Sequence, residues 1–236
     1  MRLVLQEDAI YDTIQGEGVL AGTLSTFVRL HGCDFACKCC DTKYSWAPGS
    51  TWQEVSVKVI SERVKSLAMR HVVVTGGNPL LQADELEALL DLLSGYHVTI
   101  ETQGSIFSEP CLSRCNLLSL SPKLSSWRED TLMESLLYVA HGNSEAQVKI
   151  VVQDEEETEE ALERFEEIRS EVSRSVLRWP HRRIHLILQP ECSTGLDGVH
   201  RTWSTLRSWC KLHQGLVLPF DVRIIPQLHK TAYALP

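Results

Sequence analysis

Short runs rich in apolar and β-branched residues alternate along this chain with segments of helical periodicity. The runs are typical of strands and comprise Thr26–Leu30, Val72–Thr75, His97–Glu101, Leu117–Ser121, Val148–Gln153, Ile184–Gln189 and Val222–Ile225. Strands that alternate with helices usually pair in parallel, because each helix carries the chain back across the sheet in a right-handed crossover. The alternation therefore predicts an α/β fold built on a parallel sheet.

Helical patterns fill the stretches between the predicted strands. Thr51 followed by Glu54 forms a capping-box pattern, which we expect to open a helix that runs to about Met69. An apolar stripe predicts a further helix, with its members at Leu86, Leu89, Leu90 and Leu93. The Glu-rich segment Glu155–Arg174 also has apolar residues at helical spacing, so its acids are interpreted as the solvated face of a helix.

A short polar stretch follows each predicted strand. These stretches are CDT at 40–42, TGGNP at 75–79, ETQGS at 101–105, SPK at 121–123, QPE at 189–191 and PQLHK at 226–230. Any one of them would serve as a turn, since Gly, Pro, Asn and Ser are common turn residues. Together they indicate an active site, because α/β barrels place their sites in loops at the carboxyl ends of the strands. The predicted fold class is α/β, as a partial or modified (β/α) barrel.

Size and charge exclude several classes of protein. A length of 236 residues suits one domain over 1–236, and a net charge of −8 without a basic block argues against a nucleic-acid partner. No apolar run approaches a membrane span, and the acids near the N-terminus do not suit a signal peptide. We therefore expect a cytoplasmic protein without membrane contact, whose eight cysteines stay reduced.

The segment GCDFACKCCD places Cys33, Cys37 and Cys40 at C-x3-C-x2-C spacing. Three thiolates on one loop suit three irons of a 4Fe–4S cluster and leave the fourth iron for a small molecule such as S-adenosylmethionine. A structural zinc site that adds His31 is an alternative, and incidental thiols are another. The remaining cysteines are interpreted as buried packing residues, and they are Cys111, Cys115, Cys192 and Cys210.

The cysteine motif resembles that of the radical S-adenosylmethionine (SAM) superfamily, which implies a barrel of the radical SAM type. Cys39 stands where that superfamily has an aromatic residue against the adenine. The TGGNP stretch resembles the superfamily's Gly-Gly-Glu-Pro element, with Asn78 in place of the glutamate. Its two glycines allow the backbone to approach a ligand closely, although they would serve a turn equally well.

The flanking motifs narrow the resemblance to the 7-carboxy-7-deazaguanine synthase family. They are IQGEG at 14–18, FVRLHGC at 27–33, CDT, SPK, QPE and PQLHK, in the family's order. The resemblance implies conversion of 6-carboxy-5,6,7,8-tetrahydropterin to 7-carboxy-7-deazaguanine with loss of ammonia, on the route to queuosine. It also implies Mg²⁺ as a cofactor, a homodimer, and an electron donor such as flavodoxin.

The same resemblance implies the site residues. The pterin substrate would be bound by Ile14, Gln15, Gly16, Glu17, Arg29, Thr75, His229 and Pro236. S-adenosylmethionine would be bound by Cys39, Cys40, Asp41, Gly77, Ser121, Pro122, Lys123, Gln189, Pro190, Glu191 and Cys192. Glu101 is predicted from its chemistry to bind the ribose hydroxyls, and Thr42 would be the Mg²⁺ ligand.

Some of these residues have simpler readings. Glu17 would otherwise be a solvated turn carboxylate, and Thr42 a helix cap or turn residue. Arg29 lies on a strand, where a cation needs a partner, so it would pair with the substrate carboxylate or with Glu17. Two alternative functions are an activase of glycyl-radical enzymes, which has no need of IQGEG and PQLHK, and a zinc-stabilised binding module without catalysis.

Overall fold

One curved sheet organises the molecule. The computed structural model describes residues 1–38, 40–142, 144–175, 184–191, 195–212 and 222–231. The strands are β1 (Arg2–Ile14), β2 (Leu24–Leu30), β3 (Trp52–Ser56), β4 (His71–Gly76), β5 (His97–Thr102), β6 (Leu117–Leu120), β7 (Glu145–Val152), β8 (Ile184–Pro190) and β9 (Val222–Ile224). Their order in the sheet is β3-β1-β2-β4-β5-β6-β7-β8-β9.

The sheet is parallel from β2 to β9, and β1 pairs antiparallel with both β2 and β3. Within the described residues β3 and β9 are its two edges, so the barrel does not close. An α/β fold in the form of a partial barrel is thereby confirmed. All the predicted strands are present, with shifted ends; β7, for example, begins at Glu145 rather than Val148.

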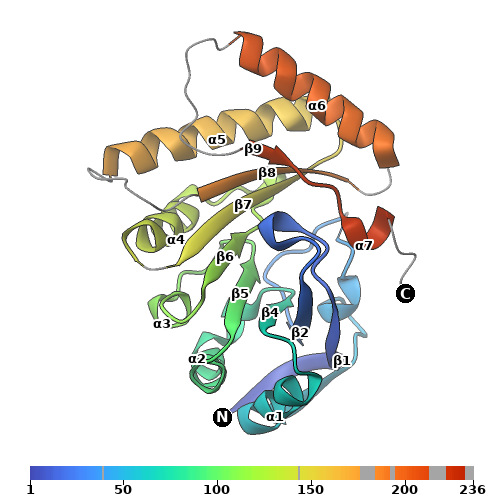
Figure 1. The fold of residues 1–236 in the computed structure, drawn as a ribbon, viewed down its shortest axis with the longest axis vertical. Helices are drawn as coiled ribbons and strands as arrows, with labels where there is room; N and C mark the ends of the chain where they lie inside the picture. The colour runs from blue at the N-terminus through green and yellow to red at the C-terminus, as the bar shows by residue number, and fades with distance from the viewer. Residues whose placement is uncertain (39, 143, 176–183, 192–194, 213–221, 232–236) are drawn as a thin grey trace.

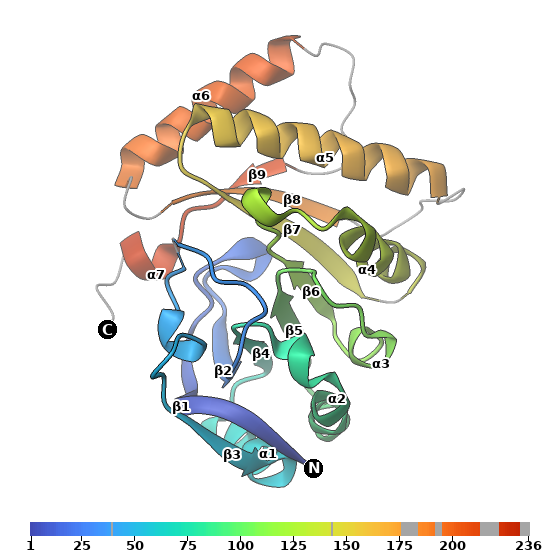
Figure 2. The same ribbon diagram turned by 180° about the vertical axis from the view of Figure 1, so that it is seen from behind.

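Helices α1 to α6 lie along the outer side of the curved sheet, and α7 lies beside the loops at one edge of it (Figures 1 and 2). The α-helices are α1 (Val57–Leu67), α2 (Ala83–Leu92), α3 (Glu109–Leu112), α4 (Glu129–His141), α5 (Glu155–Ser175), α6 (Gly195–Leu212) and α7 (Leu228–Thr231). Short 3-10 helices occur at η1 (Gly18–Leu20), η2 (Lys43–Ser45), η3 (Pro79–Gln82) and η4 (Leu124–Ser126).

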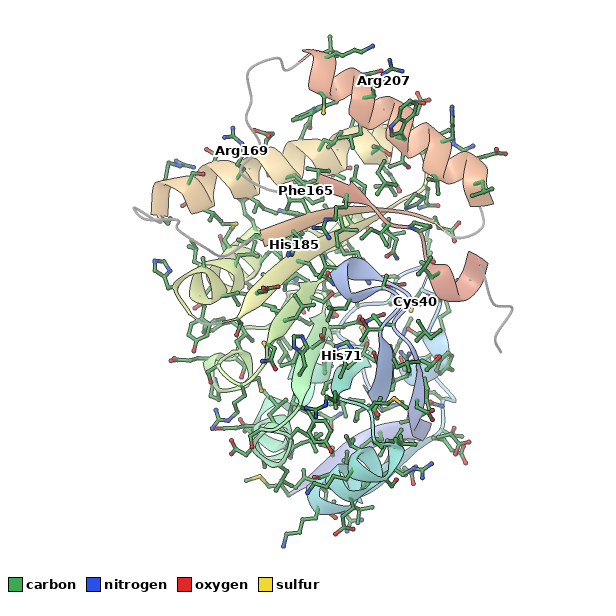
Figure 3. The ribbon with its side chains drawn as sticks, viewed as in Figure 1. Cys40, His71, Phe165, Arg169, His185 and Arg207 are labelled. Atoms are coloured by element: carbon green, nitrogen blue, oxygen red, sulfur yellow. The ribbon has the colours of Figure 1, made fainter. Side chains whose placement is uncertain are left out.

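The predicted Glu-rich helix is α5, and its apolar stripe faces the sheet. Figure 3 labels Phe165, which is almost completely buried, and Arg169, which lies on the same helix. The ring of Phe165 packs in the main core, while the acids of α5 form ion pairs along its surface, as between Arg174 and Glu171 at 2.6 Å. The segment is therefore an amphipathic helix, as its periodicity predicted.

The first predicted helix begins later than its capping-box pattern indicated. Trp52–Ser56 is an edge strand that pairs with β1, and α1 begins at Val57. The hydroxyl of Ser56 caps the helix by accepting a hydrogen bond from the Val59 N–H at 3.3 Å. Thr51 does not begin a helix, because the residues after it form strand hydrogen bonds to β1. These bonds use the backbone N–H and C=O groups that a helix starting at Thr51 would have paired.

Strand β1 had no counterpart in the sequence-based prediction. Its apolar alternation is interrupted by charged residues, and its register with β2 shifts between Leu5 and Ile10, where Asp8 has a φ of 56°. A register shift moves side chains to the opposite face, which removes the regular period on which strand prediction depends.

A buried histidine joins the beginnings of three parallel strands. His71 on β4, labelled in Figure 3, contacts the hydroxyls of Ser25 at 2.7 Å and Thr99 at 2.8 Å. Its ring also lies 5.3 Å from that of His97, and both line a cavity of about 280 Å³ at the amino ends of β4 and β5. Burial, aided by the nearby His97, lowers the pKa of His71 from 6.5 to about 4.

We expect acid to destabilise the protein through this residue. The unfolded chain binds a proton at His71 near pH 6.5 and the folded chain does so only near pH 4, so its stabilising effect is complete above pH 6.5 and lost as the pH falls to about 4. The loss is at most about 3 kcal/mol. Urea unfolding at several pH values should show that the free energy of unfolding depends less on pH in His71→Gln than in the wild type or in His97→Gln. If the free energy of unfolding changed equally with pH in all three proteins, the acid sensitivity would not come from His71.

Candidate functional site

The cysteine loop follows β2 at the carboxyl edge of the parallel strands. Cys33, Cys37 and Cys40 are partly buried, and Cys40, labelled in Figure 3, lies on the side of the sheet near α7. Burial is the main cause that raises the pKa of the Cys33 thiol, and the neighbouring Cys37 and Cys40 raise it further. Cys33 therefore lies close enough to Cys37 and Cys40 for these two residues to affect its pKa.

The Gly-Gly loop after β4 packs directly on the cysteine loop. A Cβ on Gly77 would lie 2.1 Å from the carbonyl oxygen of Gly32 and 2.6 Å from Cβ of Cys33. A Cβ on Gly76, whose φ is 149°, would lie 2.1 Å from the carbonyl oxygen of Leu30. The absence of a side chain is therefore needed at Gly77 for contact between the two loops and at Gly76 for the approach of β4 to β2, roles that sequence reasoning did not assign to them.

Asn78 connects the same two loops through its side chain. It is fully buried, and its amide nitrogen donates to Asp34 Oδ1 and Ser105 Oγ, each at 3.0 Å. Its amide oxygen accepts from the Thr102 hydroxyl at 2.9 Å, and Gln103 donates to Asp34 as well. An amide suits this position because it can donate to a carboxylate, whereas a glutamate would face Asp34 with a like charge.

The sulfur of Cys40 has two polar neighbours. The indole N–H of Trp46 donates to Cys40 Sγ at 3.2 Å, and the hydroxyl of Thr42 lies 3.6 Å from the same atom. Thr42 precedes η2, but its hydroxyl makes no capping hydrogen bond to that helix. Thr42 is nevertheless the N-cap residue of η2, and its carbonyl oxygen accepts from the N–H of Ser45 at 2.9 Å, so the reading of Thr42 as a cap or turn residue is correct for its backbone.

Gln15, Thr75 and Glu101 form a hydrogen-bonded group beside the loops. Both oxygens of Glu101 accept hydrogen bonds, one from Gln15 Nε2 at 2.9 Å and one from the Thr75 hydroxyl at 3.2 Å. The strand ends of β1, β4 and β5 thus bring together two residues predicted to bind substrate and one predicted to bind a ribose.

Glu17 is paired inside the protein. Its carboxylate accepts hydrogen bonds from Lys149, which is 5% exposed on β7, and from Gln227. Neither the solvated turn nor the Arg29 pairing considered from sequence is correct for Glu17. Burial lowers the pKa of a lysine, but here Glu17, Glu101 and Asp41 outweigh it and raise the pKa of Lys149, which therefore stays charged.

Lys123 provides a second buried amine in this region. Its Nζ donates to Ser121 Oγ at 3.1 Å. Burial is the main cause that lowers the pKa of Lys123, and the positive charge of Lys149 lowers it further. The SPK loop after β6 is thus electrostatically linked to the strand that carries Lys149.

Arg29 on β2 lies among aromatic rings. One of its terminal nitrogens donates to the Tyr11 hydroxyl at 3.0 Å, and its guanidinium carbon lies 5.7 Å from the centre of the Tyr44 ring. Its Nε is buried without a hydrogen-bond partner, and no carboxylate among the described residues forms an ion pair with it. Arg29 therefore has the surroundings of a cation that is available to an anionic ligand.

The other predicted positions follow the edge of the sheet. Ile14 ends β1, and Gly16 lies two residues after it. The carbonyl oxygen of Gly16 accepts a hydrogen bond from the N–H of Leu228 at 2.9 Å, so the IQGEG stretch contacts the PQLHK stretch. Asp41 pairs with Lys230 at 2.8 Å, which connects the cysteine loop to α7. Gln189 and Pro190 end β8, Glu191 follows them, and Pro122 lies in the SPK loop. Cys39, Cys192, Pro236 and the side chain of His229 lie outside the described residues.

The remaining cysteines divide into two groups. Cys111 and Cys115 are buried in the core, as predicted. Cys210 is exposed on α6, so the prediction of buried packing is wrong there, because it lies on the solvent side of an amphipathic helix. Among the described residues no group of three or more His, Cys, Asp or Glu side chains is arranged to hold a single metal ion.

The donor set fits a sulfur-bound cluster. Cys33, Cys37 and Cys40 lie on one loop, and N–H groups donate to two of their sulfurs, from Phe35 to Cys33 at 3.4 Å and from Trp46 to Cys40 at 3.2 Å. Hydrogen bonds to cysteine sulfur are a common feature of iron–sulfur sites.

Sequence reasoning missed several contributors to this edge, and they are Tyr11, Asp34, Tyr44, Trp46, Gln103, Lys149 and Gln227. Lys149 could have been identified from the sequence, because a lysine in the strand EAQVKIVV interrupts an apolar run. A charged residue in a strand buried on both faces requires a partner.

Comparison with known families agrees with the fold and the cysteine loop. A model of the radical SAM superfamily matches residues 27–177, which is more than half of the chain. The protein is thus a radical SAM protein by its fold and its site, and a 4Fe–4S cluster and S-adenosylmethionine are the cofactors of that superfamily. No helix among the described residues is long and apolar enough to cross a membrane.

Curated relatives identify the family more narrowly. Proteins named 7-carboxy-7-deazaguanine synthase match from Rhodopirellula baltica, at 46% identity over 49% of this chain and 44% of that protein, and from Clostridium acetobutylicum, at 33% identity over 64% and 70%. The chain belongs to the 7-carboxy-7-deazaguanine synthase family. It spans about half the length of several relatives that it matches.

A solved structure supports the fold. The crystal structure of QueE from Escherichia coli has a TM-score of 0.66 and 24% sequence identity, covering 95% of this chain and 94% of that one. At this identity the likeness establishes a shared fold and leaves the roles of individual residues to the geometry of this chain.

Proposed function

We propose that this protein is a 7-carboxy-7-deazaguanine synthase, which converts 6-carboxy-5,6,7,8-tetrahydropterin to 7-carboxy-7-deazaguanine with loss of ammonia in the queuosine pathway. Two features of the chain support the proposal. Its relatives carry that name. The polar edge of the sheet also offers a cation, carboxylates and amides, which suit a flat heterocycle with a carboxylate substituent.

The observation that carries the substrate assignment is the environment of Arg29. A guanidinium removed from water needs an anion or strong acceptors. Tyr11 supplies one hydrogen bond and Tyr44 a ring face, while Nε is buried without a partner. The carboxylate of the pterin would complete this set with a charge-assisted, bidentate contact.

The rest of the pterin would meet the groups around Gln15. Glu17, whose carboxylate is held by Lys149 and Gln227, is proposed to accept from the guanidine-like edge of the ring. The substrate contacts proposed with it are Ile14, Gln15, Gly16, Thr75, His229 and Pro236. Glu101 accepts from Gln15 and Thr75, which favours a place next to the pterin over the ribose role predicted for it.

The cofactors are proposed to bind the loops at the same edge of the sheet. Cys33, Cys37 and Cys40 would hold the 4Fe–4S cluster, and Thr42, whose hydroxyl does not cap η2, would bind Mg²⁺. When bound, the cluster and S-adenosylmethionine supply the deoxyadenosyl radical chemistry of the superfamily. The proposed S-adenosylmethionine contacts are Cys39, Cys40, Asp41, Gly77, Ser121, Pro122, Lys123, Gln189, Pro190, Glu191 and Cys192.

Further properties are proposed from the sheet, from the cysteine content and from membership of the family. The single sheet from β3 to β9 supports one radical SAM domain over 1–236. A cytoplasmic location is proposed because eight cysteines in one chain suit a compartment that keeps thiols reduced. A homodimer and a flavodoxin-like electron donor are proposed from family membership, and neither a nucleic acid nor a membrane is proposed as a partner.

Turnover tests the reaction. The reconstituted protein should form both 5′-deoxyadenosine and 7-carboxy-7-deazaguanine from S-adenosylmethionine, reductant, Mg²⁺ and the pterin under anaerobic conditions, as followed by mass spectrometry. Arg29→Gln should raise the KM for the pterin by at least about tenfold, because a charge-assisted contact of about 1.5 kcal/mol or more is lost. Deoxyadenosine without deazaguanine from a protein with a verified cluster would overturn the substrate assignment while keeping the radical chemistry.

A further inference from the structure

The indole of Trp46 is one of two polar side chains that contact the sulfur of Cys40, and it is the nearer of the two. Its N–H donates to Cys40 Sγ at 3.2 Å. Tryptophan has a single polar hydrogen and no acceptor, so this contact uses its whole hydrogen-bonding capacity. We propose that Trp46 is a positioning residue that donates to the Cys40 ligand of the cluster and raises the cluster's reduction potential, an inference that rests on the proposed ligand set.

The backbone around Trp46 holds the indole in place. Ser45, which is fully buried, donates from its hydroxyl and from its N–H to the carbonyl oxygen of Thr42, at 2.8 and 2.9 Å. The N–H groups of Trp46 and Ala47 donate to the carbonyl oxygen of Lys43 at 3.1 and 2.8 Å. The residue therefore extends from a fully hydrogen-bonded turn rather than from a loose loop.

The same turn is tied to the other end of the cysteine loop. The N–H of Gly32, next to Cys33, donates to the carbonyl oxygen of Ser45 at 2.9 Å. The distance between Trp46 and Cys40 is thus determined by contacts at both ends of the loop. Such prior ordering lets a single donor hold a chosen geometry without a further entropic cost.

A donor at this sulfur acts on the redox balance of a bound cluster. Adding an electron increases the negative charge on the thiolate ligands, and a charge-assisted hydrogen bond then becomes stronger. The N–H bond therefore stabilises the reduced state more than the oxidised state. Hydrogen bonds to the sulfurs are one of the levers that set the potential of iron–sulfur clusters.

Replacing the indole by a ring without the donor tests this role. In Trp46→Phe the reduction potential should become more negative, with the reduced-to-oxidised ratio at a given poise lowered by up to about tenfold, or about 59 mV for a one-electron couple. Trp203→Phe on the exposed face of α6 is the matched control and should leave the potential unchanged. The readout is an EPR-monitored redox titration of the reconstituted protein without S-adenosylmethionine, at full iron content.

An unchanged potential in fully loaded Trp46→Phe would overturn the inference. Should that variant lose its cluster, the wild type decides: with ¹⁵N-labelled indole, pulsed EPR of the reduced protein should detect a nitrogen coupling, and its absence would overturn the inference. Failure of the underlying proposal is separate, because it would appear as full iron retention in Cys40→Ala.

Discussion

Replacing Lys149 by methionine should abolish most of the turnover in the proposed reaction and destabilise the fold. Lys149 is 5% exposed and pairs with the partly buried carboxylate of Glu17. Removing one partner of a buried ion pair leaves the other charge without compensation, at a cost of about 3–5 kcal/mol. Urea unfolding should report that loss, and the KM for the pterin should rise because Glu17 no longer keeps its orientation.

A double variant separates stability from function. Glu17→Gln with Lys149→Met removes both charges, so much of the stability should return, whereas pterin binding should not. Lys58→Met, on the exposed side of α1, is the matched control and should resemble the wild type in both measurements. Wild-type turnover and wild-type unfolding of Lys149→Met would contradict the role assigned to the pair.

Replacing Gly77 by alanine should prevent the protein from retaining its cluster. The added Cβ would lie 2.1 Å from the carbonyl oxygen of Gly32 and 2.6 Å from Cβ of Cys33. Such overlap forces the Gly-Gly loop away from the cysteine loop, and overpacking of a tight contact costs about 1–3 kcal/mol or more. Iron and sulfide per chain after anaerobic reconstitution should fall several-fold relative to the wild type.

Gly95→Ala is the matched control for this variant. No atom lies within 4 Å of a Cβ built at Gly95, so the same substitution should leave iron content unchanged there. Circular dichroism of both variants separates loss of the cluster from loss of the fold. Full iron retention in Gly77→Ala would show that the two loops can move apart without affecting the ligands.

The parts of the fold that the sequence predicted are those coded by local spacing. The strand runs and the stripe of α5 follow from periods of two and 3.6 residues, and the cysteine motif follows from the spacing of Cys33, Cys37 and Cys40. The order of strands and loops also predicted that the polar stretches would meet, because parallel strands all end at the same edge.

Strand β1 and the start of α1 were not predictable in this way. The register shift in β1 breaks its alternation. At Thr51 the capping-box pattern was overridden by pairing between β3 and β1, which are about fifty residues apart at Arg2 and Ser56. Local propensity is weak enough that tertiary hydrogen bonds decide such cases.

For this protein the sequence alone determined the parallel strands β2 and β4 to β9, the family and the three cysteines, because each depends on residue types at short spacing. Only the tertiary structure decided which charges meet. Glu17 and Lys149 are 132 positions apart, and Asn78 and Asp34 are 44 apart. The physical reason is that a buried charge takes whichever partner the packed strands bring within hydrogen-bond distance, and that choice depends on the register of the whole sheet.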